Sequence, residues 1–266
     1  MSFGWIKPEE HSFNSLLLME RFQLRYALKR EKPELKEAMG IALGANPAVA
    51  WYIKHRCPEC AQIVDEIVGA VPKVNENADE IRRAEITVIA SLEDFIIYTT
   101  PEKMADGCDF IRGWNEERLF SLADFDGKTV LDIGAGSGRL AFAAAKKAAM
   151  VYAVEPVGTL REFMRDEIAR LGIKNVRVLD SFVENLPYPD ATFDIVMSGH
   201  VVGDFIDPEL AEIERVTKPG GWMLNVPGDS EFDIGPWKEL TLRGFEEIHY
   251  VGSFGKDVHI HRKQKL

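Results

Sequence analysis

The stretch VLDIGAGSGRL, residues 130–140, constrains the fold of this chain more than any other. It holds an apolar run and an acid, then glycines at three alternate positions, Gly134, Gly136 and Gly138, and then the start of a helical pattern. Glycines directly after a strand let the backbone approach a ligand that a Cβ would exclude, and the following helix N-terminus presents free N–H groups. In an open parallel sheet, ligands bind at the carboxyl ends of the strands. The stretch therefore predicts a strand, a loop and a helix that hold a ligand on backbone atoms.

The spacing of apolar residues changes once along the chain. From about residue 12 to about residue 123 they recur at helical spacing, and after DFDGKT short β-branched runs alternate with helical stretches. The runs predict strands at residues 130–133, 151–154, 176–179, 195–197, 223–226, 247–251 and 258–260. We therefore predict an α/β fold, with a doubly wound and mostly parallel seven-stranded sheet in residues 111–266 and an all-helical cap in residues 1–110. The PGG at residues 219–221 is interpreted as a turn before the fifth strand.

Composition limits the partners of the chain. The formal net charge of −11 argues against bulk nucleic acid or an anionic membrane face and leaves room for only a small local basic patch. No apolar run approaches the roughly 18 residues of a membrane span, and the first residues lack the basic-then-apolar order of a secretion signal. Three cysteines do not make a disulfide framework. We expect a cytoplasmic protein with no nucleic-acid and no membrane partner, and the sequence leaves its oligomeric state open.

A second feature points to a nucleotide. Glu155 ends the next predicted strand, at a separation from the glycines where a carboxylate can accept both hydrogen bonds of a ribose diol. The dinucleotide fingerprint G-x-G-x-x-G fails from Gly134, because Arg139 stands where its last glycine would be. Counted from Gly136, it is met only in its weaker form, which ends at Ala141. The spacing favours G-x-G-x-G.

Four motifs carry a resemblance to the class I S-adenosylmethionine-dependent methyltransferases, and within them to the ubiquinone/menaquinone biosynthesis branch. They are VLDIGAGSGRL, the acid in AVEP, VENLPYPDATFDIVMS and EIERVTKPGGWMLNV, in family order over about residues 130–226. The resemblance implies a Rossmann-like methyltransferase fold, S-adenosylmethionine as cofactor, S-adenosylhomocysteine as product, and a small-molecule methyl acceptor. The helical first hundred residues lie outside it.

The resemblance also implies a set of cofactor contacts. Asp132 and the glycines would hold the methionine portion and Glu155 the ribose. Near the adenine, the usual acid position holds Phe182, so either Phe182 stacks on the adenine or a small insertion restores Asp180 to the contact. The implied cofactor-binding residues are Asp132, Gly134, Ala135, Gly136, Gly138, Glu155, Pro156, Ser181, Phe182, Val183, Ser198 and Gly199.

His200 is the candidate catalytic residue, since it is the histidine that follows a predicted strand's carboxyl end. A polar loop residue or a substrate contact would suit that position equally. Asp204, Asp207 and Asp229 are near enough in sequence to join it, although each also suits a cap or a solvated loop. Methyl transfer from a sulfonium needs no strong catalytic side chain, because alignment alone can supply about 7–11 kcal/mol. Two other functions fit the motifs: a cofactor-binding module without catalysis, or a nucleotide-dependent oxidoreductase that uses the register ending at Ala141.

The helical region holds a second motif, HRCPEC at residues 55–60. Cys57 could precede a helix beginning at Pro58, which would lower the pKa of its thiol, or the motif is a plain helix start with packed sulfurs. One Cys-x-x-Cys pair supplies too few ligands for structural zinc, so we expect no metal. The aromatic residues of this region, Trp51 and Tyr52 among them, are expected mostly in the core. Because a pocket needs a wall opposite the donor methyl, we expect the helical region to select the acceptor.

Overall fold

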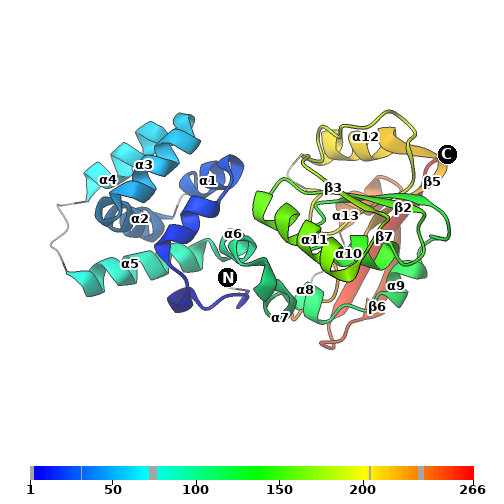
Figure 1. Ribbon diagram of the computed structural model, residues 1–266, viewed down its shortest axis with the longest axis horizontal. Helices are drawn as coiled ribbons and strands as arrows, with labels where there is room; N and C mark the ends of the chain where they lie inside the picture. The colour runs from blue at the N-terminus through cyan, green and yellow to red at the C-terminus, as the bar shows by residue number, and fades with distance from the viewer. Residues whose placement is uncertain (1–2, 31, 72–76, 204, 233–236) are drawn as a thin grey trace. The chain divides into compact units, whose positions relative to one another are not determined.

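The fold is that of a computed structural model, which describes residues 3–30, 32–71, 77–203, 205–232 and 237–266 (Figure 1). The chain divides into two compact units, Met1–Gly107 and Cys108–Leu266. The division falls before residue 108, whereas the sequence placed it after residue 110. The difference arises because the carboxylate of Asp109 accepts hydrogen bonds from Ser230 Oγ, at 3.0 Å, and from Glu231 N, at 2.9 Å. These bonds tie the start of the second unit to residues 230–231 of the same unit.

The described part of the first unit is helical, as the apolar spacing predicts. Its α-helices are α1 (Arg21–Leu28), α2 (Pro33–Ala45), α3 (Pro47–Arg56), α4 (Ala61–Ala70), α5 (Ala78–Ser91), α6 (Glu93–Ile96) and α7 (Met104–Gly107). Short 3₁₀ turns span Pro8–Glu10, Phe13–Leu18, Pro58–Cys60, Ile97–Thr99 and Pro101–Lys103. Proline opens α2 and α3, where its missing N–H costs nothing. Among the described residues, no helix is long and apolar enough to cross a membrane.

The aromatic side chains of this unit are divided between core and surface. Phe13 is buried in the core cluster, and Tyr52 packs against that cluster. Trp51, however, is 60% exposed and stacks on His55, with ring centroids 3.8 Å apart. The expectation of a core position was wrong for Trp51, because α3 turns Val49 and Ile53 inward and Trp51 lies on its other face.

The two cysteines of HRCPEC are packed side by side. Cys57 and Cys60 are both fully buried, and their Sγ atoms lie 3.0 Å apart. Burial raises the pKa of the Cys57 thiol to about 12. The expected lowering was therefore wrong, since the helix beginning at Pro58 is a single 3₁₀ turn in a buried setting. The geometry supports the plain interpretation, a helix start with packed sulfurs.

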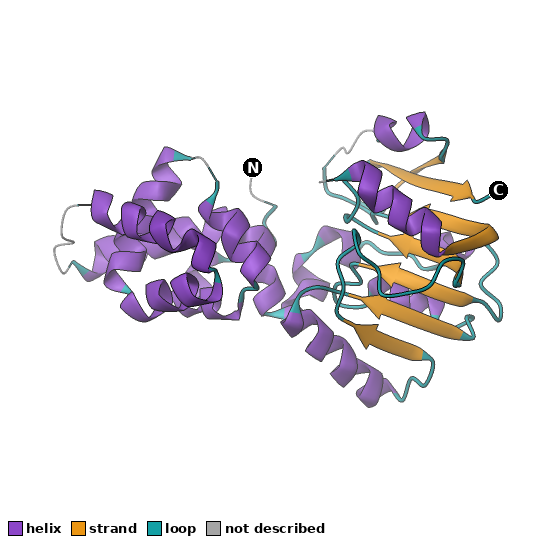
Figure 2. Cartoon of the chain, turned by 90° about the horizontal axis from the view of Figure 1, so that it is seen from above, coloured by secondary structure: helices purple, strands orange, loops and turns teal. Residues whose placement is uncertain are grey.

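The second unit is built on a β-sheet (Figure 2). The sheet has seven strands in the order β3-β2-β1-β4-β5-β7-β6. The strands are β1 (Thr129–Ile133), β2 (Met150–Val154), β3 (Val176–Leu179), β4 (Phe193–Ser198), β5 (Thr217–Asn225), β6 (Glu246–Val251) and β7 (Asp257–Gln264). The first five run parallel, and β7 is antiparallel to β5 and β6. Each lies where the sequence placed a strand, so the predicted doubly wound, mostly parallel sheet is confirmed.

Alternate residues of β1 belong to separate cores on the two faces of this sheet. Val130 belongs to a cluster with Leu140 and Met164, and Leu131 to another with Ile213 and Leu240. The helices of the unit are α8 (Asp109–Arg112), α9 (Glu117–Phe120), α10 (Arg139–Ala144), α11 (Gly158–Leu171), α12 (Ile206–Val216) and α13 (Lys238–Leu242). Because β1 is buried on both faces, the polar groups at its carboxyl end are the ones placed to meet a ligand.

The PGG sequence is part of β5 rather than a turn before it. Phe193 of β4 pairs with Thr217, but Ile195 pairs with Trp222. Four residues of β5 therefore lie opposite one residue of β4 between the two pairs, and this stretch of β5 forms a bulge. Gly220, at φ +75°, donates its N–H to Lys265 O at 2.8 Å. The prediction was wrong in detail because the bulge keeps Thr217 in the sheet, which moves the start of the strand ahead of the PGG.

Candidate functional site

The glycine loop follows β1 at the point where the sheet order reverses, between β1 and β4. Gly134, Gly136 and Gly138 have φ values of +62°, +58° and +95°, which side chains rarely adopt. A Cβ on Gly134 would overlap Val201, so packing excludes a side chain there. A Cβ on Gly136 would meet only Gly134 O, at 4.0 Å. The loop is therefore closed against the protein at Gly134 and open to a ligand at Gly136.

Glu155 joins this loop to the end of β2. Its Oε2 accepts the N–H of Gly136 at 3.0 Å, and its Oε1 accepts the N–H of Val157 at 2.9 Å. Burial raises the pKa of this carboxyl to about 7, and the two backbone hydrogen bonds oppose the rise. Each carboxylate oxygen keeps a second lone pair, so the group can still accept two hydroxyls. The structure thus brings together the two features that the sequence paired by spacing alone.

Asp132 is a buried carboxyl at the end of β1. It is 1% exposed, and its Oδ2 has no hydrogen-bond partner among the described residues. Burial raises its pKa to about 8, although the positive charge of Arg139 acts in the opposite direction. A buried carboxylate of this kind is stabilised when a cation comes near it. The unpartnered Oδ2 is therefore the atom at which a cationic ligand would stabilise the charged form of this carboxyl.

The segment after β3 carries the residues expected near an adenine. Phe182 is 46% exposed and Val183 is buried. Ser181 donates its hydroxyl to Phe182 O at 2.9 Å, and Asp180 forms an ion pair with Arg161 at 3.2 Å. Because Arg161 engages Asp180, the geometry favours Phe182 as the side chain that would meet a base. That assignment stays a prediction.

Ser198 is buried at the end of β4, and His200 follows it with φ +61°. The Nε2 of His200 lies 2.6 Å from Pro227 O. A carbonyl oxygen only accepts, so Nε2 carries the proton and Nδ1 is the acceptor nitrogen of the ring. Although His200 is an exposed residue, desolvation of its ring, followed by the nearby charge of Arg139, lowers its pKa to about 4. The ring is neutral at pH 7 and is a weak base.

Arg139 is a site residue whose role the sequence did not reveal. Its Nη2 donates to Val226 O at 2.8 Å, and its guanidinium lies 4.4 Å from the ring centroid of Trp114 and 5.8 Å from that of Phe110. Burial lowers its pKa to about 10. The one signal in the sequence is a cation within the otherwise apolar helix start GRLAFAA. The Arg139 guanidinium places a fixed positive charge beside both Asp132 and His200.

The two described acids near His200 in sequence are paired with other side chains. Asp229 is buried and accepts hydrogen bonds from Arg118, at 2.8 Å, and from Tyr250 Oη, at 3.0 Å. Asp207 pairs with Arg243 at 2.7 Å. Asp204 lies outside the described residues. The two described acids serve the structure of the unit.

The family match with known proteins covers the segment that contains the glycine loop and Glu155. Residues 131–225 match the protein family described as Methyltransferase domain. The chain is similar to the ubiquinone/menaquinone biosynthesis C-methyltransferase UbiE of Burkholderia cenocepacia (strain HI2424), with 31% identity over 161 residues, 57% of this chain and 64% of that protein. It is also similar to the demethylmenaquinone methyltransferase of Geobacillus kaustophilus (strain HTA426), with 27% identity over 142 residues, 52% of this chain and 57% of that protein. The chain thus spans less than two thirds of the length of either relative.

Among solved structures, the chain is similar to a SAM-dependent methyltransferase from Aquifex aeolicus. The identity is 24% and the TM-score 0.48, and the match covers 62% of this chain and 98% of that one.

Proposed function

We propose that the sheet unit acts as a class I S-adenosylmethionine-dependent methyltransferase domain and that the chain transfers a methyl group to a small-molecule acceptor. One observation carries the proposal. Gly136, the open position of the glycine loop, is hydrogen-bonded to the buried carboxylate of Glu155 within the segment that matches the family. A backbone surface and a diol-binding acid are thereby fixed next to each other, and this is the pair that an adenosine cofactor needs.

Different residues hold different parts of the cofactor. Glu155 accepts the ribose hydroxyls, and the backbone at Gly136 lies along the methionine portion. Asp132, with its buried and unpaired Oδ2, faces the positive charge of the sulfonium and amino groups. The exposed Phe182 stacks on the adenine. The bound cofactor supplies an already activated methyl group, so alignment is the main contribution of the protein.

His200 orients the acceptor in this proposal. Its Nδ1 accepts a hydrogen bond from an O–H or N–H group of the acceptor, because Nε2–H is engaged by Pro227. With a pKa of about 4, the imidazole holds this proton in place more readily than it removes it. We infer that His200 positions the acceptor and that the acceptor's proton passes to solvent after methyl transfer.

The proposal is tested by methyl-donor turnover against an acceptor library, with S-adenosylhomocysteine as the measured product. Thermal melting with S-adenosylmethionine, S-adenosylhomocysteine and NAD accompanies it. Stabilisation by the first two and turnover of at least one acceptor support the proposal. Stabilisation without turnover of any acceptor favours a binding module, and stabilisation by NAD alone favours an oxidoreductase.

A further inference from the structure

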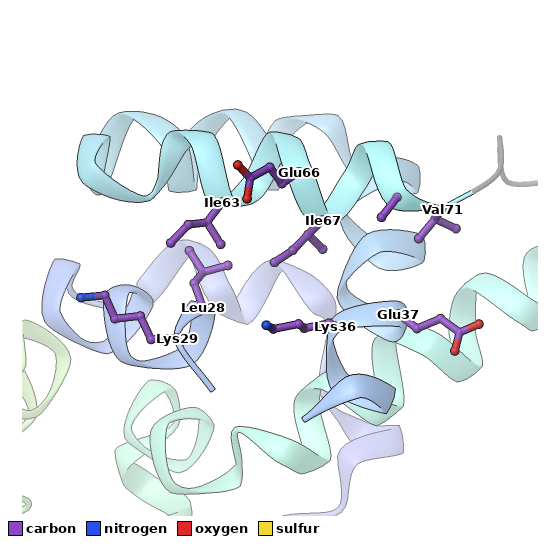
Figure 3. A pocket seen from close by; sticks show the side chains of 9 residues that line it. Leu28, Lys29, Lys36, Glu37, Ile63, Glu66, Ile67 and Val71 are labelled. Atoms are coloured by element: carbon purple, nitrogen blue, oxygen red, sulfur yellow. The ribbon is translucent and has the colours of Figure 1, made fainter. Parts of the chain in front are cut away.

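The helical unit contains a groove of its own between α1, α2 and α4 (Figure 3). The groove is open to solvent and has a volume of about 810 Å³, which lies within the roughly 300–1,000 Å³ of small-molecule sites. Its lining comes from the first unit alone. Neither Glu155 nor a residue of the glycine loop is among its lining residues, and neither the family match nor the proposed methyl transfer assigns the groove a role.

One wall of the groove is apolar and firmly held. Leu28 of α1 and Ile63 and Ile67 of α4 face the same space (Figure 3). Leu28 and Ile67 belong to the buried core of the unit, and Ile63 packs against that core. A wall anchored in this way keeps its shape without a ligand and offers contact to an aliphatic chain.

The opposite side of the groove presents a positive charge. Lys36 of α2 extends toward the space below Ile67, whereas Glu37 and Glu66 point away from it (Figure 3). Glu66 accepts a hydrogen bond from Gln62 at 2.8 Å. Within the part of the chain that the structure describes, the Lys36 ammonium has neither an ion pair nor a hydrogen bond, whereas that of Lys54 in the same unit pairs with Asp65 at 2.9 Å.

The charged residues that line the groove are balanced, with Lys29 and Lys36 against Glu37 and Glu66, in a chain of net charge −11. Lys29, which follows α1, also lines the groove, and it too lacks an ion pair to any described residue. An apolar wall facing an unpaired ammonium complements a molecule with an aliphatic chain at one end and a negative charge at the other. A cationic head would be repelled, and a short anion would leave the wall uncovered.

We propose that this groove binds a monomeric single-chain amphiphile with an anionic head. The aliphatic chain lies along Leu28, Ile63 and Ile67, and the head pairs with Lys36. The lining residues are all in the helical unit, and the proposal does not rest on the proposed methyl transfer.

The test is calorimetric titration of the full chain, without cofactor, by dodecanoate below its micelle concentration. Butyrate and dodecyltrimethylammonium serve as comparators for chain and charge. We expect saturable 1:1 binding of dodecanoate and binding at least about tenfold weaker for both comparators, since each lacks one of the two matched contacts.

Two matched pairs of variants locate the site. Lys36→Gln should weaken dodecanoate binding about fivefold, whereas Lys32→Gln, at a lysine that does not line the groove, should leave it unchanged. Ala70→Phe should block the groove that Ala70 lines, whereas Gly69→Phe on the same helix should not, because a Cβ there meets nothing within 4 Å. Circular dichroism and the melting temperature confirm that each variant is folded.

Three results would overturn the proposal. The first is equal affinity for the anionic and the cationic amphiphile. The second is dodecanoate binding that a folded Ala70→Phe variant leaves unchanged. The third is binding to anionic vesicles with none to monomeric dodecanoate, which would identify a membrane-surface contact instead.

Discussion

Replacing Glu155 by alanine should weaken binding of S-adenosylhomocysteine by about 1.5–3 kcal/mol, a roughly 10- to 150-fold rise in Kd. The magnitude is that of hydrogen bonds from the ribose hydroxyls to a charged acceptor, and the carboxylate is fixed for them by Gly136 N at 3.0 Å and Val157 N at 2.9 Å. Titration calorimetry on the wild type and the variant measures the change. Glu162→Ala, at an exposed acid on the following helix, is the matched control and should leave Kd unchanged.

The variant also removes a partner from two backbone N–H groups, so loss of loop order must be separated from loss of the ribose contact. The 2′-deoxyribose analogue of S-adenosylhomocysteine does this. If Glu155 reads the diol, the analogue binds the wild type more weakly than the parent ligand but binds the Ala variant almost as well as the parent does. Equal discrimination by both proteins would refute the assignment of Glu155 to the ribose.

Three further predictions concern the loop, the buried acid and the helical unit. Gly136→Val should abolish cofactor binding and leave the far-UV circular dichroism near native, because the branch enters the open side of the loop at φ +58°; binding at wild-type affinity would contradict this. The folded-state pKa values of about 8 for Asp132 and about 7 for Glu155 lie above the ordinary values of these carboxyls. The contribution of the two groups to stability should therefore be full below about pH 4. It should be lost as the pH rises through 7 and 8, by up to about 1.4 kcal/mol per pH unit for each group. Melting curves across this range should be flatter for Asp132→Asn, and an unchanged slope would count against the raised pKa. A soluble fragment beginning at Cys108 should still bind S-adenosylhomocysteine, with reduced affinity, but turn over no acceptor; full turnover by the fragment would rule out selection of the acceptor by the helical unit.

The sequence predicted the sheet well because its strands are short β-branched runs with helical stretches between them, a pattern that depends on local spacing. It also predicted that Glu155 and the glycine loop would meet, since parallel strands end at the same edge. The bulge at Gly220 was missed, because a PGG sequence is equally typical of a turn, and only the pairing with β4 and the bond to Lys265 distinguish the two.

Other features depend on tertiary contacts that one-dimensional patterns do not contain. Nothing near Arg139 in sequence indicates that Val226 and Trp114 lie beside its guanidinium. The high pKa of the Cys57 thiol follows from burial, whereas the motif alone suggested a helix N-terminus that would lower it. Trp51 is exposed because only one face of α3 points inward. The composition of this helix alone does not say which residues occupy that face.

The central claim is that the open glycine loop and Glu155 hold S-adenosylmethionine for methyl transfer. The most direct measurement incubates the full chain with methyl-labelled S-adenosylmethionine and the acceptor library, and follows label and S-adenosylhomocysteine by mass spectrometry. The account predicts that one labelled methyl group appears in an acceptor for each S-adenosylhomocysteine formed, and that Gly136→Val abolishes both signals. The claim would be contradicted if Gly136→Val formed labelled product at the wild-type rate, or if NAD, and neither S-adenosylmethionine nor S-adenosylhomocysteine, bound the wild-type chain.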